Sequence, residues 1–288
     1  MNTLATRSVE RLVRGMPTSD GAGVKLTRVI GQPQLADLDP FLMLDEFGTD
    51  NPGDYIAGFP DHPHRGFETV TYMLDGRMRH RDNHGHEGVL VPGSVQWMTA
   101  GRGIIHSEMP EQQEGRMRGF QLWINLPARE KMTAPRYQEF GPQRIPTVEA
   151  AAARVKVIAG TVEGVTGPIA QPATEPTYLD VELAPGGQFT HALPAGHAAF
   201  VYVYEGAVSI GAGERATAVD SHDLAVLSDT GAVRIEARAG SGTAPPPARL
   251  ILVAGKPLRE PVAKYGPFVM NTREELMQAF QDFQSGRF

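Results

Sequence analysis

The chain has 288 residues, with 33 acidic and 27 basic side chains, 32 glycines, 23 prolines, no cysteine and a formal net charge of −6. A single hydrophobic core rarely grows beyond about 250–300 residues, so we expect two domains of about 130–150 residues. The lack of cysteine excludes disulfides, thiolate catalysis and cysteine-held iron or zinc. The acidic balance, with no Lys/Arg cluster, argues against direct nucleic-acid binding.

The first residues, MNTLATRSVERLVRGMP, lack the continuous apolar core and the cleavage signal of a secretory peptide. No run in the chain approaches the roughly 18 apolar residues that a membrane span needs. We therefore expect a soluble, cytoplasmic protein with no membrane partner.

Short strand-like runs separated by glycine and proline turns dominate the first half. Asn51-Pro-Gly53, Asp75-Gly76 and Pro92-Gly93 are typical turn sequences between such runs. This spacing predicts an all-β, antiparallel barrel or sandwich. The expected strands are 26–30, 41–46, 67–74, 89–91, 95–98 and 120–126.

The triplet His62-Pro-His64 places two imidazoles two residues apart. In a β-strand, side chains at i and i+2 leave the same face about 6.6 Å apart, so both can reach one space. Pro63 restricts the residue before it to extended backbone, which favours a strand at His62.

His106-Ser-Glu108 repeats this pattern later in the chain. Imidazole and carboxylate are ligands that borderline divalent metals take, so the two triplets on adjacent strands predict a four-ligand metal site. The alternative is that His62 and His64 are surface residues and His106 is a hydrogen-bonded core histidine. We expect His80, His84 and His86, which lie in a strongly polar stretch, to form a solvated hairpin outside the ligand set.

The pattern weakens between residues 127 and 146, a polar stretch with proline at both ends, and then a second series of strands begins. We predict an N-terminal domain over residues 1–135 and a C-terminal domain over 136–288. The second half has no His-x-His pair and no later His-x-Glu, so we expect a barrel without metal ligands. Near the end, Thr272 and Glu275 have the spacing of a helix-capping box, and Leu276, Phe280 and Phe283 follow at helical spacing.

The blocks HPHRGFETVTYML, GHEGVLVPGSVQWMTAGRGIIHSEMP, FQLWINLP and FGPFVMNTREEL resemble the pirin family of the bicupin superfamily over nearly the whole chain. The resemblance implies two consecutive cupin barrels of jelly-roll type and a short C-terminal helix. It also implies one divalent transition metal, expected to be Fe(II), bound by His62, His64, His106 and Glu108 in the first barrel. Nitrogen and oxygen ligands also accept Mn, Co, Ni, Cu or Zn.

Other residues near these motifs have two readings. Glu68 could share a face with His64 by strand periodicity, but the resemblance assigns the carboxylate ligand to Glu108 and leaves Glu68 to orient a ligand imidazole. Gly101-Arg102-Gly103 forms either a bulge that aims the ligand strand or an ordinary loop. The candidate pocket walls, which could equally be plain core, are Met98, Met109, Phe120 and Trp123.

By resemblance, the expected activity is that of a quercetinase, a flavonol dioxygenase that opens the heterocycle with dioxygen and releases carbon monoxide. Glu108, the expected catalytic base, or a metal-bound hydroxide would then accept the proton of the flavonol 3-hydroxyl. The alternative is an iron-dependent redox sensor that acts through a protein partner. An enzyme needs a cavity of several hundred Å³ beside the metal, whereas a sensor does not.

Overall fold

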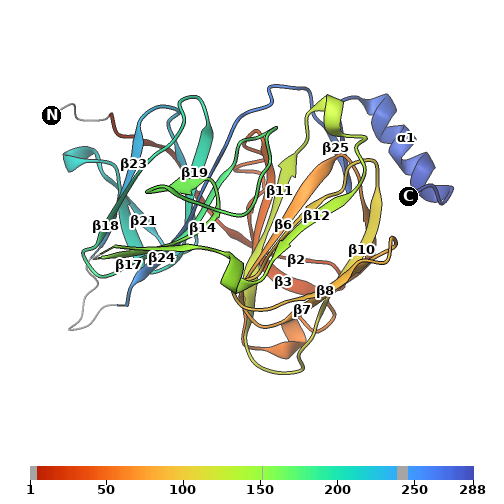
Figure 1. Ribbon diagram of the computed structural model, residues 1–288, viewed down its shortest axis with the longest axis horizontal. Helices are drawn as coiled ribbons and strands as arrows, with labels where there is room; N and C mark the ends of the chain where they lie inside the picture. Colours follow the sequence, from red (N-terminus) through yellow and green to blue (C-terminus); the bar gives the residue numbers. More distant parts are fainter. Residues whose placement is uncertain (1–4, 151, 239–245) are drawn as a thin grey trace. The chain divides into compact units, whose positions relative to one another are not determined.

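A computed structural model describes residues 5–150, 152–238 and 246–288, and these fold into two compact units. One unit contains residues 16–144 and 258–288, and the other contains the N-terminal segment up to Gly15 and residues 145–257. We call them the first and second barrel. Figure 1 shows that strands dominate both.

The first barrel consists of two antiparallel sheets and a hairpin. Side chains from both sheets, such as Phe47, Met78 and Leu90, pack into one core, so the sheets face each other. The larger sheet has the order β12 (Arg136–Phe140), β9 (Val95–Thr99), β6 (Phe67–Asp75), β11 (Met117–Asn125), β4 (Phe41–Thr49), β3 (Val24–Ile30) and β2 (Met16–Asp20). The smaller sheet has the order β5 (Phe59–His64), β10 (Ile104–Pro110), β7 (Met78–Asp82) and β8 (Glu87–Leu90), and the hairpin pairs β25 (Ala263–Tyr265) with β26 (Phe268–Met270).

The second barrel repeats this plan around an interior of aliphatic side chains such as Leu179, Val201 and Leu252. Its larger sheet has the order β1 (Val9–Arg14), β22 (Asp223–Leu227), β19 (Ala198–Glu205), β24 (Ala248–Gly255), β17 (Thr177–Leu183), β14 (Ala153–Ala159) and β13 (Thr147–Ala150). The smaller sheets are β18 (Gln188–Ala192), β23 (Ala232–Ala237), β20 (Ala207–Ile210) and β21 (Thr217–Asp220), and β15 (Thr161–Val162) with β16 (Val165–Thr166). The prediction of two β-barrels is confirmed.

The predicted C-terminal helix is α1 (Arg273–Gln284), and its capping box is present: Thr272 accepts a hydrogen bond from the backbone N–H of Glu275, whose carboxylate accepts one in return. Phe280 and Phe283 pack on Phe268 of β26, with ring centroids 4.8 and 6.1 Å apart. The helix therefore belongs to the first barrel.

The contiguous division at residues 135 and 136 differs from the observed units in three respects. β12 pairs with β9 and so extends the first barrel to Arg144. Residues 258–288 return to the first barrel, whereas β1 pairs with β22 in the second. Pairing between strands far apart in sequence, which composition does not reveal, fixes these boundaries.

Arg65 and Lys131 attach the returning segment to the corner that follows His64. Arg65 is buried; its Nη1 donates to Asp282 of α1 over 2.7 Å and its Nε donates to the Arg102 carbonyl. The buried Lys131 ammonium donates to the carbonyls of Gly66 at 2.8 Å and Val269 at 3.0 Å. Burial lowers the pKa of Lys131 to about 8. Arg65 is thus enclosed directly after β5, the strand that carries His62 and His64.

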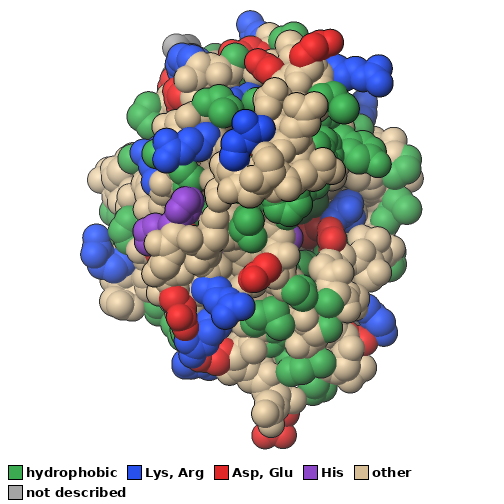
Figure 2. All heavy atoms as spheres, turned by 90° about the vertical axis from the view of Figure 1, so that its right-hand side faces the viewer, with side chains coloured by type: hydrophobic (Ala, Val, Ile, Leu, Met, Phe, Trp, Pro, Cys, Tyr) green, Lys and Arg blue, Asp and Glu red, His purple; other side chains and the backbone are tan. Residues whose placement is uncertain are grey.

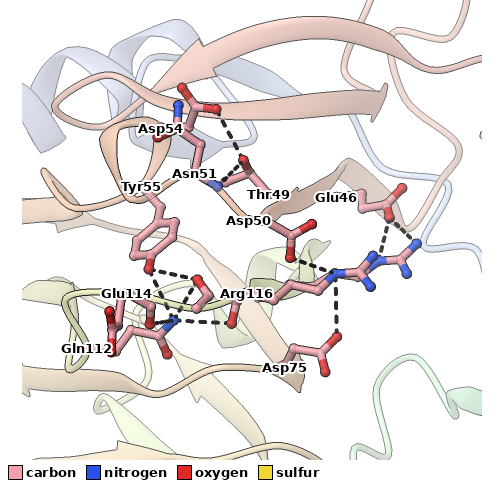
Figure 3. Close-up of polar contacts among 12 residues, drawn as sticks. Glu46, Thr49, Asp50, Asn51, Asp54, Tyr55, Asp75, Gln112, Glu114 and Arg116 are labelled. Carbon is pink, nitrogen blue, oxygen red and sulfur yellow. Dashed lines mark hydrogen bonds and ion pairs between the residues drawn. The ribbon is translucent and has the colours of Figure 1, made fainter.

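A buried ion pair connects β4 and β11 at one end of the first barrel. Arg118 donates from Nε and Nη2 to the Glu46 carboxylate over 3.0 and 2.8 Å, and both side chains are 5% exposed. Figure 3 shows Glu46 beside a more open network in which Arg116 lies 3.8 Å from Asp75. Both pairs join the same region of the barrel, so they form a matched comparison.

Replacing Glu46 with alanine should lower the free energy of unfolding by about 3–5 kcal/mol, because it leaves the Arg118 guanidinium buried without this carboxylate. Asp75→Ala, which removes a partner from a half-exposed pair, should cost at most about 1 kcal/mol. Urea denaturation of the two variants measures the difference. Equal losses for both would contradict the expectation.

Candidate metal centre and cavity

The two histidine triplets lie on adjacent strands, as predicted. β5 and β10 run antiparallel, with His106 opposite His62 and Ile104 opposite His64. Because side chains two apart on a strand share a face, this register directs all three imidazoles to one place. One ring nitrogen from each of the three histidines lies within 4.8 Å of those of the other two.

The spacing of these nitrogens fits a metal ion. The Nε2 atoms of His62 and His64 are 3.0 Å apart, and the His62 and His106 ring centroids are 4.5 Å apart. Two imidazoles bound at right angles to one ion, each at about 2.1 Å, would have their nitrogens separated by about 3.0 Å. The cluster can therefore hold a metal ion.

Burial favours the neutral form of the inner two imidazoles. His64 and His106 are 2% and 1% exposed, and desolvation, assisted by the neighbouring histidines, lowers both pKa values well below the ordinary value. Neither ring nitrogen of His106 has a hydrogen-bond partner within the described parts of the chain. A buried polar atom without a partner is costly, and a bound cation would relieve that cost.

The same burial couples the stability of the metal-free protein to pH. Because the folded imidazoles have lowered pKa values, below about pH 6.5 the unfolded chain binds more protons than the folded chain. Above that pH, the free energy of unfolding should not be reduced by protonation of these two histidines. It should fall by up to about 1.4 kcal/mol per pH unit for each histidine as the pH decreases further. Urea titrations of metal-free protein measure this slope, and His106→Ala should reduce it by about half; an unchanged slope would exclude His106 as a contributor.

Glu108 lies two residues after His106 on β10 and is buried. Thr71 of β6 donates to its Oε1 over 2.9 Å, and Gln121 of β11 donates to its Oε2 over 3.3 Å. The carboxylate is thus oriented by neighbouring strands and lies outside the three-histidine cluster, although it borders the same cavity. Thr71 and Gln121 both lie in the conspicuous sequence blocks, but only the register shows that they reach Glu108.

Glu68 engages a different partner. Its Oε1 accepts a hydrogen bond of 2.6 Å from Thr99, whose hydroxyl in turn accepts one from Arg136 Nε over 3.3 Å. Glu68 is fully buried within the larger sheet and is not among the residues that line the cavity. Its role in orienting a ligand imidazole stays a prediction.

A cavity of about 740 Å³ opens beside His62 and His64. Its walls include an apolar group around Trp123, whose ring lies 5.2 Å from that of His64. Charged side chains, among them Arg28, Asp45 and Lys264, line the same cavity. Figure 2 shows this side of the molecule, where hydrophobic side chains border a hollow in which a histidine and acidic side chains are visible. The lining residues are Asp20, Gly21, Ala22, Leu26, Arg28, Gly31, Leu42, Met43, Asp45, Phe47, Phe59, Pro60, Asp61, His62, His64, Met78, Glu108, Gln121, Trp123, Lys264, Tyr265, Gly266 and Pro267.

Of the four candidate pocket walls, only Trp123 lines this cavity. Met98 packs in a small core cluster with Tyr137, and Phe120 is fully buried against Tyr72. Met109 lies against Gly58, where an added Cβ would approach its sulfur to 2.8 Å. None of these three residues lines the cavity: Met98 and Phe120 are fully buried, and Met109 is partly buried.

The polar hairpin is formed by β7 and β8, but one of its three histidines is not solvated. His80 is buried, and its Nε2 lies 2.7 Å from Glu139 of β12. His84 and His86 are exposed as expected. The strand alternation of β7 turns His80 inward, and its acidic partner comes from a strand that sequence reasoning placed at the domain boundary.

The Gly101-Arg102-Gly103 segment is a turn that leads into β10. Both glycines have positive φ, at 52° and 140°, and Arg102 between them is exposed. Because the Arg102 carbonyl accepts a hydrogen bond from the Arg65 side chain, the turn before β10 is also joined to the segment that follows β5. Among the residues described, no helix is long and apolar enough to cross a membrane.

The chain is similar to known proteins in both sequence and fold. The family models described as pirin and pirin C-terminal cupin domain match residues 23–124 and 178–288. A Pseudomonas aeruginosa protein named "putative quercetin 2,3-dioxygenase" is 53% identical over 285 residues, covering 97% of each chain. Human pirin is 43% identical over 284 residues, covering 98% of this chain and 94% of the human one. The crystal structure of a quercetin 2,3-dioxygenase from Acinetobacter baumannii is 32% identical, covers 99% of both chains and superposes with a TM-score of 0.88.

Proposed function

Because the chain belongs to the pirin family, and so has two cupin barrels, we propose that it is a metal-dependent dioxygenase of flavonols such as quercetin. The observation that carries this proposal is the cavity of about 740 Å³ bordered by His62, His64 and Glu108. Small-molecule sites commonly measure about 300–1,000 Å³ and combine apolar walls with a few convergent polar groups. A purely regulatory metal site would not need such a space.

We propose that His62, His64 and His106 hold the metal and that Glu108, from the cavity side, contributes the fourth ligand. The bound ion, which we expect to be iron, would acidify a coordinated hydroxyl and mediate electron transfer to dioxygen. The neutral state of His64 and His106 leaves their lone pairs available for this role.

The remaining groups bind and orient the substrate. Trp123 and the aliphatic lining provide an apolar surface for the flavonol rings. Glu108 is placed to accept the proton of the flavonol 3-hydroxyl, and the hydrogen bonds from Thr71 and Gln121 hold its carboxylate for that transfer. The overall reaction consumes one molecule of dioxygen per flavonol and releases one of carbon monoxide as the ring opens.

Anaerobic loading of metal-free protein with Fe(II), Mn(II), Ni(II), Cu(II) or Zn(II) tests the proposal. Each form is then given quercetin and oxygen, and oxygen uptake and carbon monoxide are measured. Metal-dependent turnover with equal amounts of the two gases supports the dioxygenase and identifies the competent ion. Tight metal binding without turnover would contradict it and favour an iron-dependent regulatory protein that acts through a partner.

A further inference from the structure

Two cations line the cavity, and their surroundings differ. Arg28 donates to Asp45 from Nε over 2.9 Å and from Nη2 over 2.7 Å, and Nη2 also meets Asp20 at 2.8 Å. Lys264 has no carboxylate within ion-pairing distance in the described part of the chain, and its ammonium makes one long contact of 3.4 Å to the Leu42 carbonyl. Of the two cations, Lys264 is therefore the one whose N–H groups can still donate hydrogen bonds to a ligand.

Lys264 reaches the cavity from the hairpin of β25 and β26. It pairs with Val269, and the hairpin tip, Tyr265-Gly266-Pro267, lines the cavity as well. The far side of the hairpin is fixed, since the Pro267 carbonyl accepts from the Arg65 N–H over 3.3 Å. The hairpin thus joins the metal-binding corner to the cavity wall that carries Lys264.

Contacts also connect Lys264 to the metal cluster along the cavity wall. Leu42, whose carbonyl receives the Lys264 ammonium, packs in one apolar cluster with Trp123. The Trp123 ring lies 5.2 Å from the His64 ring. A flat aromatic ligand on Trp123 would therefore approach the histidines on one side and Lys264 on another.

Tyr265, the next residue of β25, adds an aromatic surface to the same cavity. Its side chain is 70% exposed, which is unusual for a large aromatic residue, and its ring is 5.8 Å from Phe280 of α1. Phe280 supports one side of the ring, and the other side is open to a stacking partner.

The electrostatic setting favours an anionic ligand group. Desolvation lowers the pKa of Lys264, and the nearby Arg28 charge lowers it further, against the opposite effect of Asp37. An ammonium that has no carboxylate within ion-pairing distance gains stability when a negative group approaches it.

We propose that Lys264 and Tyr265 form a second recognition subsite, which binds an acidic substituent carried on an aromatic ring remote from the metal. The preferred ligands are then polyphenols that bear a phenolate, carboxylate or sulfonate, and not neutral flavonols. This inference rests on the proposed function for the orientation of the ligand at the metal.

Ligand binding without turnover tests the subsite. Zn(II)-loaded protein is titrated under nitrogen with quercetin and with its B-ring sulfonate, and tryptophan quenching gives both dissociation constants. Wild type should bind the sulfonate more tightly than quercetin, with a preference that weakens as salt increases. Lys264→Met should weaken sulfonate binding by about tenfold, as expected for loss of a hydrogen bond to a charged group, and change quercetin binding less than about twofold.

Matched variants distinguish the effect of removing the Lys264 charge from a nonspecific loss of ligand binding. Lys264→Arg should keep most of the preference, Tyr265→Ala should weaken both ligands, and Lys25→Met, which removes an exposed lysine outside the cavity, should change neither. Equal loss of both ligands in Lys264→Met, or no preference in wild type, would overturn the subsite. If the protein binds the sulfonate selectively but never consumes oxygen with any metal, the proposed reaction fails and the subsite stands. If it turns quercetin over without selectivity, only the subsite fails.

Discussion

Replacing His106 with alanine should abolish metal retention, with a loss of affinity of more than about 100-fold. Removing a residue that only supports a ligand already costs about 10–100-fold, and His106 supplies one of the three clustered ring nitrogens. Oxygen uptake should disappear with the metal. Metal content after gel filtration, together with competition against a chelator of known affinity, measures the change.

His84→Ala is the control, because His84 lies in the same half of the sequence but is exposed on the turn between β7 and β8. It should bind metal as wild type does. Full metal occupancy in His106→Ala would contradict the ligand assignment, and far-UV circular dichroism of both variants excludes a loss of fold as the cause.

Glu108→Gln should separate metal binding from turnover. The amide keeps the size and a neutral oxygen donor, and the three histidines remain, so metal affinity should fall by about 10–100-fold, less than in His106→Ala. The amide cannot accept a proton as a base, so turnover of quercetin should fall by about 100- to 10,000-fold. Metal content and oxygen uptake on the same samples give both quantities.

Glu114→Gln, an exposed carboxylate in the loop after β10, should leave both quantities unchanged. If Glu108→Gln keeps full turnover, Glu108 is not the base. If the variant loses metal as completely as His106→Ala, Glu108 acts chiefly as a ligand, and its role as base would need a different test.

The sequence predicts the histidine cluster well because strand periodicity is local. His62 and His64 share a face by their spacing alone, and only the pairing of β5 with β10 has to be assumed for His106 to join them. The sequence does not decide which carboxylate joins the histidines, since Glu68 and Glu108 both have the strand spacing that would place them on the histidine face. The structure gives them different partners, Thr99 for Glu68 and Thr71 with Gln121 for Glu108.

The cavity wall could not be predicted because apolar residues occur on both faces of a buried strand. Phe120 and Trp123 are three residues apart on β11 and therefore face opposite sides of the sheet: Trp123 lines the cavity, whereas Phe120 packs against Tyr72 on the other face. Without the register there was no way to select between them. The charged residues of the wall could not be predicted for another reason: Arg28 and Lys264 are 236 positions apart, and only the folded chain brings both to the same cavity.

The return of residues 258–288 to the first barrel has a consequence for biosynthesis. The corner after His64 depends on Asp282 and Val269, which accept hydrogen bonds from Arg65 and Lys131. On the ribosome, Asp282 is added 138 residues after Arg144, which takes roughly 7–28 s at about 5–20 residues per second. Throughout that interval the histidine strands exist without these contacts, so the corner after His64 is completed only once the segment that contains Val269 and Asp282 has been made.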